Sequence, residues 1–124
     1  MNLKALLLIL TSVGLSVLGQ ITLKIGMSSS AAQDAMADPS VAKGYLAVLL
    51  LPAVIVGLMA YALSALVWLK VLSQLAVSMA APFVALGMVL TMIAGAVFLG
   101  ESIPAIRMVG AVFIVAGIVM VGMS

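Results

Sequence analysis

The sequence predicts an all-α membrane protein with four transmembrane helices. Of its 124 residues, 67% are hydrophobic and only 6% are charged, and the mean hydropathy is +1.49. Soluble domains carry about a quarter charged residues, and one membrane span needs about 20 apolar residues. Turn residues divide the chain into four stretches of this length. We therefore expect a single domain over residues 1–124, with spans at about 5–25, 45–70, 78–99 and 103–122 and a polar loop at 27–43.

Turn and cap residues set the limits of the first two spans. Gly26 is well placed as the C-cap of the first, and the polar segment after it is the one long extramembrane loop, of which residues 31–37 can form a short interfacial helix. The second span begins near Tyr45 and ends at Trp68, where amphipathic aromatics favour the headgroup level. Pro52 lies in its first third and should bend the helix or delay its start.

The last two spans form a tight hairpin. Ser78 is a suitable N-cap for the third span, and Pro82 then falls in the first helical turn. Gly100 ends this span and Pro104 restarts a helix almost at once.

Four spans place both termini on the same side of the membrane. That side carries Lys4 and Lys70, and the other carries Lys24, Lys43 and Arg107. A difference of one basic residue does not fix the orientation, so a single topology and a dual topology both stay open.

Small residues predict that the chain forms a dimer. The third span places Gly87, Thr91 and Gly95 at four-residue spacing, and the fourth places Gly110 and Gly117 at heptad spacing. Such faces allow helices to approach closely in lipid. Either face can pack within the four-helix unit, but four short helices hardly enclose a substrate alone. We expect at least one face to be intermolecular.

A polar stripe runs along the first span. Ser12, Ser16, Gln20 and Lys24 follow each other at four-residue intervals on one side of the helix. Polar groups in a span favour a partner helix or a wet cavity, so this stripe is the predicted substrate contact. The serines can alternatively bond to their own helix, and Lys24 can snorkel to the headgroups or bind a phosphate.

The second span carries a matching face of Gly57, Tyr61, Ser64 and Trp68. Its apolar body and several hydroxyls suit a substrate with a polar and a hydrocarbon part. Alternatively, Ser64 bonds to its own helix and Trp68 is an interface anchor.

The residue inventory excludes several functions. The absence of Cys and His argues against disulfides and zinc sites, and we expect no metal or cofactor. The chain offers no nucleophile–base pair and no basic cluster, which argues against an enzyme and against nucleic-acid binding. All three acids lie outside the predicted spans, so a buried coupling carboxylate is missing.

Several short motifs resemble the small multidrug resistance family of the drug/metabolite transporter superfamily. The closest resemblance is to undecaprenyl-phosphate-aminoarabinose flippase subunits. It rests on Gly19-Gln20 with Lys24, on Trp68-Leu69-Lys70-Val71-Leu72, on Leu75-Ala76-Val77-Ser78 with Ala81-Pro82, on Gly100-Glu101-Ser102-Ile103-Pro104, and on the run from Gly110 to Gly117. Ser16 stands where the drug exporters carry a glutamate.

This resemblance implies a flippase subunit in the bacterial inner membrane. It would move a polyprenyl-phosphate-linked sugar or similar anionic lipid, as a homodimer or as a heterodimer with a related four-helix subunit. The alternatives are a small multidrug-type exporter and a non-transporting membrane assembly subunit. The candidate substrate-binding residues are Lys24, Gln20, Ser16, Tyr61, Ser64, Trp68, Thr91, Glu101 and Arg107.

Overall fold

The structure is a computed structural model that describes residues 2–124. When residues Val77–Phe98 are counted as one helix, four helices are long and apolar enough to cross a membrane. This confirms the predicted number of spans. The elements, in chain order, are α1 (Leu3–Met27), α2 (Ser30–Met36), α3 (Val41–Leu49), α4 (Pro52–Gln74), α5 (Val77–Ala80), α6 (Pro82–Phe98) and α7 (Ala105–Met123).

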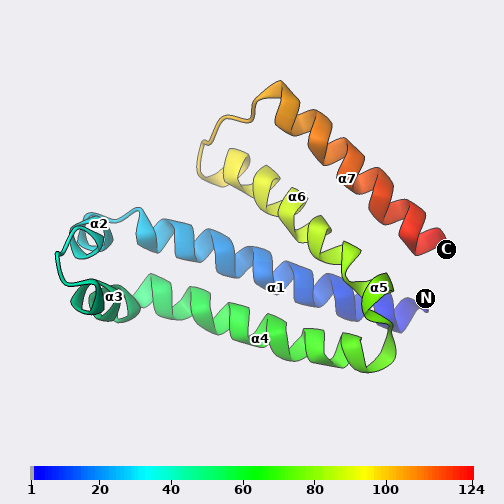
Figure 1. Cartoon of the computed structure of the whole chain (residues 1–124), viewed down its shortest axis with the longest axis horizontal. Coiled ribbons are helices and arrows are strands. Elements are labelled where there is room, and N and C mark those ends of the chain that lie inside the picture. Colours follow the sequence, from blue (N-terminus) through cyan, green and yellow to red (C-terminus); the bar gives the residue numbers. More distant parts are fainter. Residues whose placement is uncertain (1) are drawn as a thin grey trace.

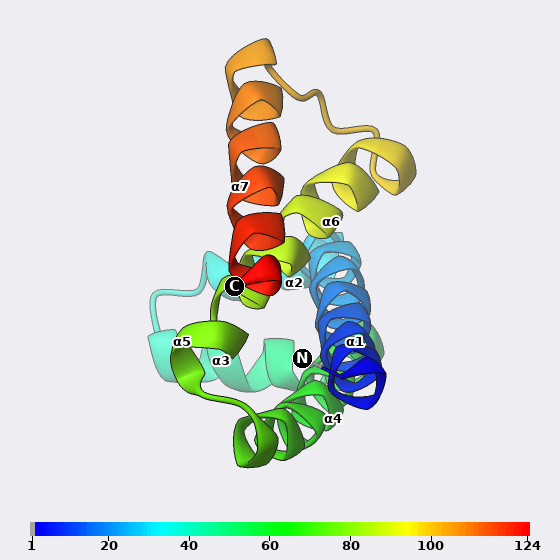
Figure 2. The same cartoon turned by 90° about the vertical axis from the view of Figure 1, so that its right-hand side faces the viewer.

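The long helices form a hairpin with two further helices on one side. α1 and α4 lie side by side and antiparallel, while α6 contacts α1 and α7 contacts α6 (Figure 1). A second view shows α7 standing apart from the α1–α4 pair (Figure 2). Both ends of the chain lie at one end of the bundle, and α2 and α3 lie at the other (Figure 1).

Each end of the bundle has its own apolar cluster. Near the chain termini, Ile9, Val71 and Phe83 are buried together with Ile118 of α7. At the other end, a smaller cluster of Ala32, Val48 and Val54 joins α2 and α3 to the start of α4.

Glycines explain why α1 and α4 pack so closely. A side-chain carbon at Gly19 would lie 3.0 Å from the carbonyl oxygen of Gly57, and one at Gly57 would lie 2.7 Å from Leu23 Cγ. Small residues of this kind allow helix backbones to approach in lipid, where van der Waals packing drives association. Gly57 therefore serves the α1–α4 contact.

The second long helix begins at Pro52 rather than near residue 45. Proline disfavours a helical backbone in the residue before it, and Leu51 is accordingly extended (φ −70°, ψ 133°). Residues Val41–Leu49 form the separate helix α3, so the predicted second span joined two elements. Within the predicted loop at 27–43, α2 confirms the short helix expected at 31–37, whereas Tyr45 lies on α3 rather than at the end of a span.

Three predicted cap positions can also be compared with the structure. Helix α1 continues through Gly26 to a C-cap at Ser28, and Gly26 lies instead in the close contact with α4. Ser78 lies inside α5, whose N-cap is the extended residue Ala76. Gly100 has the predicted role of a terminator, with a positive φ of 68° that favours glycine.

The two predicted small-residue faces have different surroundings. A side-chain carbon at Gly87 would lie 3.4 Å from Val13 and 3.7 Å from Ser16, so this part of α6 packs on α1 within the protomer. Gly110 and Gly117 on α7 have no neighbouring atom within 4 Å of that position. Both α7 glycines therefore have free space beside them, and at Gly110 this space belongs to a cavity between α6 and α7.

Candidate functional site

The predicted polar stripe on α1 divides into an internally bonded half and a free half. The Ser12 hydroxyl is buried and donates to the Ser64 carbonyl of α4 at 2.7 Å. The Ser16 hydroxyl donates to the Val13 carbonyl one turn back at 2.8 Å. Further along α1, the side chains of Gln20 and Lys24 are exposed. Only this second half of the stripe presents its polar groups to a ligand.

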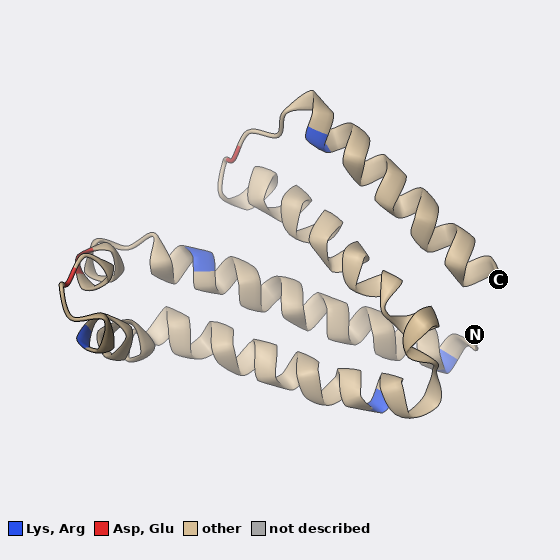
Figure 3. Cartoon of the chain, viewed as in Figure 1, with Lys and Arg blue, Asp and Glu red and all other residues tan. Residues whose placement is uncertain are grey.

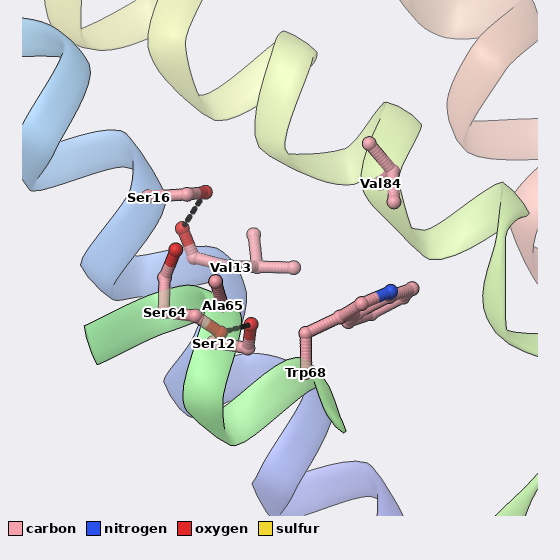
Figure 4. A pocket seen from close by; sticks show the side chains of 7 residues that line it. All are labelled: Ser12, Val13, Ser16, Ser64, Ala65, Trp68 and Val84. Carbon is pink, nitrogen blue, oxygen red and sulfur yellow. Dashed lines mark hydrogen bonds between the residues drawn. The ribbon is translucent and has the colours of Figure 1, made fainter. Parts of the chain in front are cut away.

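The serines border a cavity of about 220 Å³ between α1, α4 and α6 (Figure 4). The Ser64 hydroxyl donates to the Tyr61 carbonyl at 2.7 Å, so the three serine protons are directed at backbone oxygens. The indole of Trp68 forms one wall (Figure 4). The lining residues are Ser12, Val13, Ser16, Ser64, Ala65, Trp68 and Val84. Because these hydroxyls are already bonded, the cavity offers a ligand mainly apolar contacts, although three serines line it.

A second cavity, of about 250 Å³, collects the unbonded polar groups. We call it the Lys24 cavity. Gln20 and Lys24 reach it from α1, and Thr91 and Glu101 reach it from α6 and the turn that follows. The apolar part of its lining is Ile21, Gly95 and Leu99. The structure thus brings together four of the nine predicted site residues, although they are far apart in sequence.

Thr91 is the most unusual residue of the Lys24 cavity. Its hydroxyl oxygen is buried and has no hydrogen-bond partner within residues 2–124. Leaving a buried polar group unpaired costs about 1–3 kcal/mol. A threonine hydroxyl in a span normally bonds to its own helix, as Thr11 and Thr22 do. The Thr91 hydroxyl is therefore available to a ligand.

The turn after α6 folds Glu101 back over the helix. The left-handed conformation of Gly100 reverses the chain, and the backbone amides of Leu99 and Glu101 both donate to the Gly95 carbonyl, at 3.1 and 3.2 Å. The Glu101 carboxylate then lies against Gly95, in space that any side chain there would occupy. Gly95 is the site residue that the sequence interpretation missed, since its spacing indicated only helix packing. The signal in the sequence is that Gly95 lies six residues before Glu101, with the turn residue Gly100 between them.

Other predicted residues lie elsewhere. Arg107 borders a separate cavity of about 230 Å³ between α6 and α7, together with Met88 and Gly110. Arg107 therefore lines a different cavity from Lys24. The connection of α6 to α7 holds the first turn of α7 away from α1 (Figure 1). Tyr61 packs over Gly19 in the α1–α4 contact.

The charges follow the expected membrane pattern. Acidic and basic residues lie towards the ends of the long helices and in their connections, while the helix centres are uncharged (Figure 3). The band on α1 that belongs to its last-turn lysine, Lys24, lies towards the end that carries α2 and α3 (Figure 3). The Lys24 cavity therefore lies near one end of the spans, where a charged group can reach headgroups.

Comparison with known proteins identifies the family of the chain. The model of the EamA-like transporter family, which belongs to the drug/metabolite transporter superfamily, matches residues 5–123. No curated protein and no solved structure gives a significant match. The finer resemblance to aminoarabinose flippase subunits receives no support from these comparisons. Because the family match covers all four long helices, the chain belongs to the EamA-like transporter family and is a multi-pass membrane protein.

Proposed function

We propose that this chain is a transporter subunit that moves an anionic glycolipid, such as a polyprenyl-phosphate-linked sugar, across the bacterial inner membrane. The observation that carries this proposal is the Lys24 cavity, where a cation, an amide, a carboxylate and an unpaired hydroxyl meet near one end of the spans. A phosphate ester needs a cation, and a sugar needs several hydrogen-bonding groups beside it.

The four polar side chains have distinct roles in this proposal. Lys24 pairs with the phosphate as a point charge, and Gln20, one turn deeper on α1, bonds to sugar hydroxyls with its amide. The unpaired Thr91 hydroxyl gains its missing partner from the ligand. Glu101 accepts from a further donor on the headgroup. Because Gln20 and Lys24 are exposed, the headgroup can enter sideways from the lipid.

The cavity beside Trp68 suits the hydrocarbon part of the same substrate. Its serine protons are already bonded to backbone carbonyls, so it offers mainly apolar contacts. Contact with the indole face and with Val84 favours an isoprenoid chain over a second headgroup. This division assigns the polar and apolar parts of the substrate to two cavities that share the α1–α6 contact.

We further propose that the transporter acts as a dimer with both termini on one side of the membrane. Four crossings return the chain to its starting side. The exposed glycines of α7, Gly110 and Gly117, have free space beside them into which a second four-helix subunit, identical or related, can pack. The partner would close the Lys24 cavity, which one protomer leaves accessible.

An exporter of small drug-like cations is the second candidate, because Trp68 offers an aromatic wall for such a molecule. Its coupling would need a carboxylate inside the spans. Ser16 stands where related drug exporters carry that acid, and its hydroxyl bonds to the helix. This observation favours the lipid substrate.

The test is lipid flipping in sealed proteoliposomes. A fluorescent short-chain polyprenyl phosphate that carries a hexose is placed in one leaflet, and its appearance in the other is followed. We expect Lys24→Ala to reduce transport by about ten- to a hundredfold, since a hydrogen bond to a charged group contributes about 1.5–3 kcal/mol. Lys24→Arg should retain more activity, because the charge survives.

Lys70→Ala is the matched control. Lys70 is an exposed lysine near the C-terminal end of α4, whereas the Lys24 end of α1 lies beside the N-terminal end of α4. It should flip lipid at the wild-type rate. Wild-type flipping by Lys24→Ala would show that Lys24 only snorkels and would contradict the proposed site. Proton movement driven by a cationic drug, without lipid flipping, would favour the exporter. Activity in neither assay would indicate an assembly subunit.

A further inference from the structure

We propose that α3 is an interfacial helix whose apolar face lies in the headgroup region of the lipid bilayer. It would mark the membrane boundary beside Lys24. This placement does not depend on which substrate the chain carries.

Helix α3 exposes an apolar face that the protein leaves uncovered. Its buried side consists of Gly44 and Val48, which face α2 and the start of α4. Much of the remaining surface carries large apolar residues that are 47–69% exposed. They occupy two neighbouring lines of the helix, Val41, Tyr45 and Leu49 on one and Leu46 and Leu50 on the other.

The orientation of α3 fits a helix that lies on a membrane. In Figure 1, α2 and α3 are seen almost end-on, while α1 and α4 run across the picture. In Figure 2, the view along α1, α3 runs across the picture instead. Helix α3 is therefore crosswise to the spans, which places its axis along the membrane surface if α1 and α4 cross the bilayer.

Helix α4 does not need α3 to cross the bilayer. Its 23 residues extend about 34 Å, which exceeds the hydrocarbon thickness of about 30 Å. The residues before Pro52 must therefore lie at or beyond the boundary. A large apolar face at that depth is stabilised by burial among headgroups and upper acyl chains, and Tyr45 is an aromatic suited to this level.

Lipid explains this face better than a protein partner does. Further exposed apolar side chains follow directly in the chain at the start of α4, among them Ile55 and Val56, which meet lipid in a spanning helix. Lys43 borders it and can extend its ammonium towards water. The nearby charges balance, with Asp34 and Asp38 against Lys24 and Lys43, so apolar contact rather than attraction to anionic lipid should hold α3 in place.

This placement sets the depth of Lys24. A side-chain carbon at Gly26 would lie 3.1 Å from Ala53 and Val54, so the end of α1 and the start of α4 are level with each other. Lys24 comes two residues before Gly26, about 3 Å further into the bilayer. With α3 in the headgroups, the Lys24 side chain lies within reach of lipid phosphates.

The chain contains no cysteine, so single spin labels can be introduced directly. Labels at Leu46 and at Leu49 in the full chain, in phosphatidylcholine vesicles, are compared for relaxation by oxygen and by a water-soluble nickel complex. Asp38 is the aqueous control, and Leu63, exposed in the middle of α4, is the mid-bilayer control. Val41 and Leu50 provide further positions if one label disturbs the fold.

We expect the labels on α3 to have oxygen-to-nickel ratios several-fold above that of Asp38 and below that of Leu63. Adding anionic lipid should leave these ratios unchanged. Three outcomes would overturn the proposal. A ratio equal to that at Asp38 would put the face in water, and a ratio equal to that at Leu63 would make α3 part of a span. Exclusion of both relaxing agents would show that a second copy or another protein covers it.

Discussion

At the scale of single residues, hydrogen bonding separates structural polar groups from functional ones. Ser12, Ser16 and Ser64 have the same chemistry as Thr91, but each serine hydroxyl finds a backbone carbonyl within 2.8 Å. The Thr91 oxygen is buried in the described structure without one. A buried donor without a partner costs more than a hydrogen bond gains, which makes Thr91 the residue with most to gain from a ligand.

Gly95 should position Glu101 in the Lys24 cavity. Gly95→Ala places a carbon where the Glu101 carboxylate now lies, and we expect this carboxylate to move out of the cavity. Binding of a short-chain polyprenyl phosphate hexose, measured with purified protein in nanodiscs, should then weaken about as much as it does in Glu101→Gln. The double variant should be no weaker than either single variant, because both act on the same group.

Gly14→Ala is the control for this experiment, since its side chain would meet no atom within 4 Å. It should bind normally, and both alanine variants should retain their helix content, because alanine favours a helix over glycine by about 1 kcal/mol. Additive losses in the double variant would mean that Gly95 acts separately from Glu101.

At the scale of elements, one proline separates two helices that the hydropathy pattern joins. An uncharged, mostly apolar sequence runs from Gly44 to Leu69, and nothing in its hydropathy marks an end to α3. The break comes from the backbone, because Leu51 must be extended before Pro52. The cluster of Ala32, Val48 and Val54 then holds α3 against α2 and the start of α4.

We therefore expect Pro52→Ala to favour a continuous helix from α3 into α4. The variant restores an amide donor and removes the restriction on Leu51. In a continuous helix, spin labels at positions 43 and 63 would lie about 30 Å apart along the axis, at 1.5 Å per residue. Pulsed electron spin resonance should show this longer distance in Pro52→Ala and a shorter one in the wild type.

Pro39→Ala provides the comparison, because Pro39 lies in the turn between α2 and α3. It should leave the distance between the two labels unchanged. A wild-type distance in Pro52→Ala would show that contacts of α2 and α3, rather than the proline, hold the two helices apart.

At the scale of the whole molecule, α7 is the least integrated span. In its most apolar stretch, 6% of the residues are buried, whereas 22% are buried in the corresponding stretch of each of the other spans. Only its C-terminal half reaches the apolar cluster, through Ile118. Exposure to lipid costs a span little, so this alone requires no partner. The open glycines at 110 and 117 are what favour one.

We expect the paired substitution Gly110→Leu and Gly117→Leu to reduce dimer formation by at least about tenfold. Bulky side chains prevent the backbone approach on which small-residue interfaces depend, and about 1.4 kcal/mol is enough for this change. Energy transfer between labelled copies at high lipid dilution measures the dimer. Gly14→Leu is the control, placed at another open glycine, on α1.

An unchanged dimer in the paired variant would move the interface away from α7. A wild-type protein that stays monomeric at low density would remove the two-subunit cavity and leave the Lys24 cavity open to lipid.

The sequence by itself determined the class of this protein and the number of its spans. Hydropathy over about 20 residues reports whether a segment can enter lipid, and this requires no knowledge of its neighbours. The same holds for local signals such as Gly100, whose role as a terminator depends on its own backbone conformation. The family match over residues 5–123 agrees with this reading.

Only the tertiary structure decided which polar residues meet. Lys24 and Glu101 were both predicted for the site, yet so was Arg107, and sequence position alone does not tell which of them lines the cavity. Whether a residue lines the cavity depends on which helix faces oppose each other. Contacts between residues distant in the chain, such as Gly19 with Gly57, decide this. The bonding of the serines and the orphaned hydroxyl of Thr91 follow from the same packing, because a hydroxyl's partners depend on the helix beside it.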